Sequence, residues 1–187
     1  MSTVCKLETL SIDEYLANEL KSDVRHEFIN GQIYAMVGAS NIHNLIAGSL
    51  FASLRSHLNP PCHVYTSDMK VRVDNDFYYP GLSVSCEPVT DIAYYLETPV
   101  LIVEVLSPTT EGRDRVEKSL AYRSLSSLKE YVLVSQNKAQ VEVLRRVTGG
   151  WEIETFSVGD NVRFEAVSMT IAIDRIYEDV ARSIWRK

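Results

Sequence analysis

Long apolar runs are missing from this 187-residue chain, and basic residues do not predominate in it. No stretch reaches the roughly 18 apolar residues that a membrane span requires, so we expect no membrane partner. The first ten residues, MSTVCKLETL, hold no basic segment followed by an apolar stretch, and we expect no secretory signal. The net charge of −6 argues against a tight, non-specific nucleic-acid binder. It does not exclude a nuclease, because a metal ion can bring positive charge to an acidic site.

Cysteine is scarce as well. The three cysteines, Cys5, Cys62 and Cys86, are widely separated and show no CxxC spacing. An odd, scattered set of this kind favours reduced thiols and a cytoplasmic location. No His/Cys cluster has zinc spacing, and neither a Gly-rich phosphate loop nor a nucleophile elbow is present.

What is present is the composition of an ordinary globular domain, with 45% apolar and 24% charged residues. The length predicts a single domain over residues 1–187. Ser11 and Glu14 form a capping box that starts a helix, and Asn30-Gly31 is the signature of a type I′ hairpin turn. We expect helices at residues 12–20, 41–58, 113–125 and 176–185, and strands at residues 26–29, 32–37, 63–73, 77–86, 100–106, 131–135, 141–147 and 151–157. This order predicts an α/β fold with a mixed central sheet flanked by helices.

Glu104 is the most informative residue, because it lies inside the apolar run VLIVEVL at residues 100–106. That run predicts a central strand buried on both faces. Burial of an ionised carboxylate costs several kcal/mol unless it is paired or bound to metal. Glu104 is therefore either a buried residue satisfied by an Arg, Lys or backbone partner, or a metal ligand or acid/base group.

Other candidates are weaker when each is taken alone. Asp114, Lys118 and Tyr122 recur at i, i+4 and i+8 on one helix stripe, and the plain alternative is a surface ion pair. Four further polar residues have plain readings as well, as solvent-facing strand residues or a core-edge histidine: Glu27, Asp68, Lys70 and His43.

The run LIVEVLSPTTEGRDRVEKSLAYRSLSSLKEYVLV closely resembles the signature of the Uma-type restriction-endonuclease family. This bacterial family belongs to the PD-(D/E)xK nuclease superfamily. The segments HEFINGQIYAM, SDMKVRV and YYPGLSVSC are also similar to it, so the resemblance covers about residues 8–180 in the family's order. It implies a restriction-endonuclease-like core, a DNA substrate, Mg²⁺ or Mn²⁺ as cofactor, and a homodimer to which Trp151 could contribute a contact.

The resemblance also assigns site residues. Glu104 matches the carboxylate of (D/E)xK, and Lys118 on the following helix matches a lysine that has migrated from position 106, which is Leu106 here. Glu27 matches a family glutamate and could add a metal-site carboxylate, Asp114 joins the catalytic set, and the backbone carbonyl of Val105 could be a further metal ligand. In such a site the metal ion activates water for phosphodiester hydrolysis, and the lysine stabilises the charged transition state.

One metal-ligand position departs from the pattern. The family's Pro-Asp is Pro80-Gly81 in this chain. The missing aspartate is a primary ligand of Mg²⁺, which prefers oxygen ligands. The leading hypothesis is therefore a metal-dependent DNA endonuclease that is weak or inactive because of Gly81. The alternatives are a non-catalytic DNA-binding or regulatory relative, and a protein-interaction domain suggested by the acidic charge.

Overall fold

The computed structural model describes residues 10–90 and 94–181. Its helices are α1 (Ile12–Glu19), α2 (Asn41–His57), α3 (Glu111–Arg113), α4 (Ser119–Ser124) and α5 (Ile173–Ile176), with a π-helical turn η1 (Asp114–Lys118) and a 3-10 turn η2 (Glu165–Val167). Its strands are β1 (His26–Ile29), β2 (Gln32–Ala35), β3 (His63–Thr66), β4 (Lys70–Val73), β5 (Asp76–Tyr78), β6 (Leu82–Ser85), β7 (Tyr95–Leu96), β8 (Pro99–Leu106), β9 (Glu130–Ser135), β10 (Gln140–Val147), β11 (Gly150–Ser157), β12 (Asn161–Phe164) and β13 (Met169–Ala172). None of the helices in these residues is long and apolar enough to cross a membrane.

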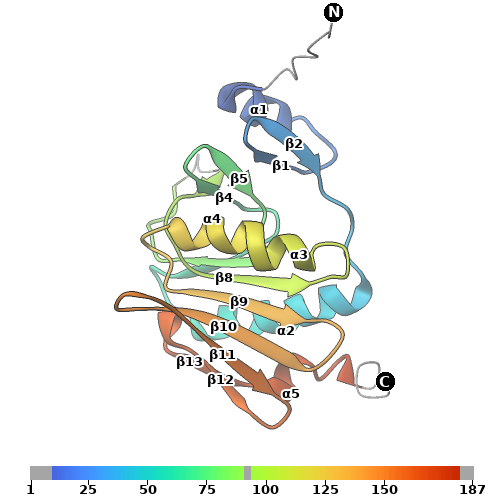
Figure 1. Ribbon diagram of the computed structural model, residues 1–187, viewed down its shortest axis with the longest axis vertical. Helices are drawn as coiled ribbons and strands as arrows, with labels where there is room; N and C mark the ends of the chain where they lie inside the picture. The colour runs from blue at the N-terminus through green and yellow to red at the C-terminus, as the bar shows by residue number, and fades with distance from the viewer. Residues whose placement is uncertain (1–9, 91–93, 182–187) are drawn as a thin grey trace, which may run out of the picture.

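The strands form a mixed α/β architecture, as the sequence predicted. The central sheet has the order β11-β10-β9-β8-β6-β3, in which β8 and β9 run parallel and the other pairs are antiparallel. A second sheet, β2-β1-β5-β4-β7, lies beside it, and β12 and β13 form a separate pair. Figure 1 shows the α3–η1–α4 segment on one face of the central sheet and α2 on the other.

Strand β8 lies inside the central sheet and divides the core between its two faces. The odd-numbered side chains face α2, and the even-numbered ones face α4, because side chains alternate along a strand. The α2 side of the core includes Ile46, Leu50, Leu54, Leu101, Val103 and Val105. The α4 side includes Ile102, Leu106, Tyr122, Tyr131 and Leu133. Glu104 shares the parity of Ile102 and Leu106, so its carboxylate belongs to the α4 side.

Several helices and strands lie where local sequence signals predicted them. The capping box of Ser11 and Glu14 is present, and Asn30 and Gly31 have φ of 52° and 79°, as a type I′ turn requires. The second helix spans Asn41–His57 with Ser40 as its N-cap. The hairpin of β10 and β11 also agrees with the expected residues.

The two long strands expected at 63–73 and 77–86 are wrong. Each is divided into two short strands that belong to different sheets. Residues Ser67–Met69 turn between β3 and β4, and Tyr79–Gly81 separate β5 from β6. Pro80 has no backbone N–H for a ladder hydrogen bond, which favours a break in the strand at this point. The chain therefore passes from one sheet to the other immediately before the candidate site.

Two helix predictions also need correction. The helix expected at 113–125 begins at Glu111, contains the π turn η1 and ends at Ser124. The helix expected at 176–185 is replaced by the short α5, followed by a turn at residues 177–180, and residues 182–187 lie outside the described part of the chain. The strands β12 and β13 were not predicted.

The expectation of reduced cysteines is wrong for two of the three. Cys62 and Cys86 form a disulfide. The β3–β6 ladder pairs His63 with Ser85, so the residues just outside that pair face each other across the two strands. A separation of 24 residues in sequence concealed this proximity. Cys5 lies outside the described residues.

Candidate active site

Four charged residues singled out from the sequence meet in one buried cluster. The Lys118 ammonium lies 2.9 Å from Glu27 Oε1, 3.1 Å from Glu104 Oε1 and 3.6 Å from Asp114 Oδ1. Each of the four residues is less than 8% exposed. Glu27 is therefore not on an outward polar face, and the stripe of Asp114 and Lys118 is not a surface ion pair.

The π turn explains how the helix brings Asp114 and Lys118 to Glu104. A π-helical turn is wider than an α-helical one and shifts the carbonyl pairing of the residues within it. Tyr131 on β9 donates its hydroxyl to the carbonyl of Asp114 at 2.8 Å, which satisfies a buried acceptor in this turn. Tyr122, one turn further on, lies with its hydroxyl 3.5 Å from Glu104 Oε1.

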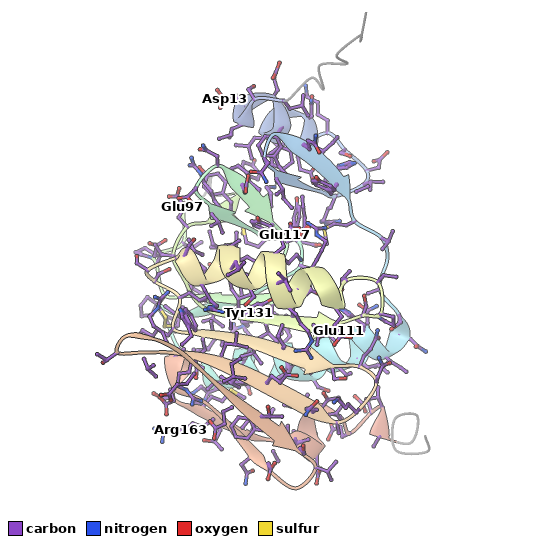
Figure 2. All side chains as sticks on the ribbon, viewed as in Figure 1. Asp13, Glu97, Glu111, Glu117, Tyr131 and Arg163 are labelled. Atoms are coloured by element: carbon purple, nitrogen blue, oxygen red, sulfur yellow. A yellow bond between two sulfur atoms is a disulfide. The ribbon has the colours of Figure 1, made fainter. Side chains whose placement is uncertain are left out.

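Glu27 is held by groups that the sequence did not single out. The backbone N–H of Tyr79 donates to Glu27 Oε1 at 3.1 Å, and the guanidinium of Arg113 lies 3.1 Å from Glu27 Oε2. Arg113 also pairs with Glu117, which Figure 2 shows on the side of the helix that faces the N-terminal segment. The spacing of Arg113 and Glu117 could have revealed their own pair, but no local pattern linked them to Glu27.

Gly81 lies directly beside Glu104. Its backbone N–H donates to Glu104 Oε2 at 3.0 Å. A Cβ atom at position 81 would be 3.6 Å from the same oxygen and 3.0 Å from the carbonyl oxygen of Val103. An aspartate here would thus place its carboxyl group next to that of Glu104, after a small shift of the neighbouring backbone.

Burial governs the electrostatics of the cluster. It raises the pKa of Glu104 to about 7, a rise that Lys118 and the Gly81 N–H oppose and that Asp114 and Glu27 reinforce. Burial also raises the pKa of Asp114, against the effect of Lys118. For Lys118 burial lowers the pKa, but the three carboxylates outweigh it and hold the pKa above its ordinary value.

The cluster opens into a cavity of about 610 Å³. Its walls include Gly81, Glu104, Asp114 and Lys118, together with the N-terminal turn of α2 and the 107–110 loop. Val105, the proposed carbonyl ligand, also lines it. Three of the four side chains of the cluster, those of Glu104, Asp114 and Lys118, thus border an open space.

The residues present do not fit the two-carboxylate Mg²⁺ site that the resemblance implies. Gly81 supplies no side-chain oxygen, and its N–H occupies one oxygen of Glu104. Lys118 takes the central place among the carboxylates. Among residues 10–90 and 94–181, no group of three or more His, Cys, Asp or Glu side chains is arranged to hold a metal ion.

The remaining candidates are separated from one another. Asp68 is in the turn before β4, where its carboxylate pairs with Arg25 at 2.9 Å and is 68% exposed. Lys70 is instead buried, and its ammonium donates to the Tyr79 hydroxyl at 3.2 Å. Neither is the solvent-facing strand residue that was expected, because Asp68 is not in a strand and Lys70 is buried. His43, on the first turn of α2, lines the cavity.

The fold is that of the restriction-endonuclease-like class. A crystal structure described as a putative nuclease belonging to DUF820, from Anabaena variabilis, superposes with a TM-score of 0.74 over 90% of this chain and 98% of that chain, at 18% identity. That likeness concerns the fold alone.

Sequence comparison identifies the family itself. Residues 12–173 match the Uma2 family, described as "Putative restriction endonuclease", and the chain belongs to this family. Two proteins of Synechocystis sp. (strain PCC 6803) are similar over most of their length. Slr1290 is 34% identical over 92% of this chain and 93% of its own, and sll1609 is 31% identical over 91% and 100%. Both are described as uncharacterised.

Proposed function

We propose that this protein is a restriction-endonuclease-like nuclease that acts on DNA and cleaves it slowly, because its divalent-ion site lacks one carboxylate. The observation that carries the proposal is the contact between Gly81 and Glu104. A backbone N–H meets Glu104 Oε2 at the position where the family pattern has an aspartate. Because carboxylate charge supplies much of the attraction for a hard cation, Mg²⁺ binding should be weak.

Lys118 supports this proposal from the other side of the cluster. Its ammonium contacts Glu27 and Glu104 directly and compensates for their charge. A divalent ion that approached Glu104 would have to compete with an ammonium that is already buried and hydrogen-bonded. The same compensation favours a second candidate function, a DNA-binding relative that does not cleave, because the cluster is charge-paired without a metal ion.

The expected cytoplasmic location and homodimer remain proposals. The bridge between Cys62 and Cys86 removes cysteine usage as an argument for the cytoplasm, which then depends on the DNA substrate alone. Trp151, which could contribute to a dimer contact, is only partly exposed. Its ring is half-buried and lies 4.5 Å from the guanidinium of Arg146 and 5.5 Å from that of Arg123.

Plasmid nicking with Mg²⁺ and with Mn²⁺ tests the function. We expect slow or undetectable cleavage by the unaltered protein and restored cleavage by Gly81→Asp. Gly81→Ala introduces the same Cβ beside Val103 without an oxygen, and Gly81→Asn adds an oxygen without charge. Both should recover little, and combining Gly81→Asp with Glu104→Ala should abolish the gain.

The outcomes separate the two candidates. Robust, Glu104-dependent cleavage by the unaltered protein would refute the proposal and would make Glu27 the first suspect for completing the site. DNA binding in a gel-shift assay, combined with no cleavage by a folded Gly81→Asp variant, would favour the non-catalytic relative. Thermal unfolding of each variant shows whether it has folded.

A further inference from the structure

Strand β2 forms an edge of the second sheet and exposes apolar side chains on both of its faces. Among residues 10–90 and 94–181, β1 is the only strand that pairs with it. Ile33 is 48% exposed on one face, Tyr34 is 42% exposed on the other, and Val37, just after the strand, is 76% exposed. An exposed apolar edge is a template for pairing with another strand.

Charged side chains, which commonly protect an edge strand, are missing from this one. No Asp, Glu, Lys or Arg lies between Glu27 and Arg55, although these types make up 24% of the chain. The edge strand β11 of the central sheet, in contrast, carries the exposed Glu152 and Glu154. Each copy of the chain has a net charge of −6, so an uncharged edge is a surface on which two copies can meet without repulsion.

The hydrogen bonds of the β1–β2 hairpin determine which backbone groups point outward. The Met36 N–H donates to the Arg25 carbonyl at 2.8 Å, on the side toward β1. The direction of these groups alternates along an antiparallel strand, so the N–H and C=O groups of Ile33, Ala35 and Val37 point away from β1. Those three residues therefore present the donors and acceptors that a further antiparallel strand would use.

We propose that two copies of the chain form a homodimer by antiparallel pairing of their β2 strands, with Ala35 opposite the partner's Ala35 on the two-fold axis. In this register Ile33 faces the partner's Val37. On the other face of the sheet, Tyr34 faces the partner's Met36. Every cross-strand pair is apolar, and the small Ala35 side chain allows close approach at the axis. The contact is isologous, so it closes as a dimer and does not continue as a filament.

This dimer has both charged clusters on the same side of the joined sheet. Glu27 is opposite Tyr34 in the β1–β2 ladder, and Arg113 contacts both residues, so the cluster lies on the Tyr34 face. The two-fold axis of an antiparallel strand pair is perpendicular to the sheet, and rotation about it leaves that face on the same side. Residues 36–40, which follow β2, line the cavity, so the partner lies beside this wall. The arrangement suits cleavage of both strands of one DNA duplex, a consequence that, unlike the dimer itself, rests on the proposed function.

Sedimentation velocity of the full-length protein over a range of concentrations tests the interface. We expect the unaltered protein to have twice the mass of one chain. Ala35→Lys should weaken association by about a hundredfold or more, because two ammonium groups then meet at the axis. Val37→Lys changes a side chain that is already exposed in one copy, and it should weaken association by about tenfold or more. Ile153→Lys is the matched control, since it adds the same charge to a 65% exposed residue of the edge strand β11 and should leave the dimer unchanged.

Two results would overturn the inference. One is a monomer mass for the unaltered protein at the highest concentration, and the other is a dimer that Ala35→Lys and Val37→Lys leave intact. Dissociation by Ile153→Lys alone would assign the contact to β11 and refute it as well. Circular dichroism and thermal unfolding show whether each variant is folded. Because the readout is mass, a monomer that cleaves DNA refutes only this inference, and a β2 dimer that neither binds nor cleaves DNA refutes only the proposed function.

Discussion

Replacing Lys118 with Met should destabilise the protein severely. The ammonium is 7% exposed and lies within 3.1 Å of oxygens on both Glu27 and Glu104. Methionine keeps most of the length of the side chain but removes its charge, so that buried carboxylates lose their shared cation. Removing one partner of a buried ion pair costs about 3–5 kcal/mol. This is a large part of a total stability of about 5–15 kcal/mol.

Urea unfolding at pH 7.5, with thermal unfolding beside it, measures this loss. For a domain of this size a loss of about 3–5 kcal/mol corresponds to a decrease in Tm of roughly 6–20 °C. The exposed Lys138→Met is the control and should change stability by less than about 0.5 kcal/mol. A Lys118→Met protein that unfolds with the wild-type midpoint would refute the reasoning.

A double-mutant cycle isolates the pair itself. Glu104→Gln removes one of the charges that Lys118 compensates, so the double variant with Lys118→Met should lose less stability than the sum of the two single losses. A folded double variant beside an unfolded Lys118→Met would support the same conclusion. Additive losses would mean that Lys118 stabilises the fold independently of Glu104, through Glu27, Asp114 or packing.

Three further predictions concern other parts of the molecule. Arg115 pairs with Glu142 through two hydrogen bonds of 2.7 and 2.8 Å that lower the pKa of Glu142, so Glu142→Gln should cost about 1 kcal/mol at pH 7. That difference is present above the unfolded pKa of about 4.5 and should disappear as the pH falls through the lower folded pKa, which urea unfolding between pH 7 and pH 3 measures. Tyr131→Phe should cost about 0.5–1.5 kcal/mol in the same assay at pH 7, because it removes a buried hydrogen bond to the carbonyl of Asp114, and unchanged stability would contradict this. Light scattering should give the mass of a homodimer, whereas a monomer mass at high concentration would exclude it.

The elements that the sequence predicted are those whose causes are local. A capping box, an Asn-Gly turn and a regular apolar repeat each act within a few residues, and Ser11, Asn30 and the helix at Asn41–His57 were read correctly for that reason. The separation of β4 and β5 into a second sheet depends on contacts between distant segments. The same is true of the Cys62–Cys86 bridge, since neither cysteine has a partner nearby in sequence.

The sequence predicted a site residue only where an apolar run showed that the residue would be buried in a strand. Glu104 stands out because it interrupts an apolar run, and its burial followed from that run. Glu27 gave no such signal. It alternates with Phe28 as an outward residue would, yet both are buried, because Arg113 and Lys118 cover the face that would otherwise meet water. Only the tertiary packing of η1 distinguishes the two cases.

At position 81 the sequence motif and the structure give different information. The sequence identifies a missing carboxylate, but it does not say what the remaining carboxylate does instead. The structure answers that Glu104 is held by the Gly81 N–H on one oxygen and by Lys118 on the other. Each of these contacts stabilises a buried charge that a divalent ion would otherwise have to compensate. The same two contacts therefore keep the cluster stable without a metal ion and oppose the binding of one, so the stability of the cluster and the slow hydrolysis that we propose have a common cause.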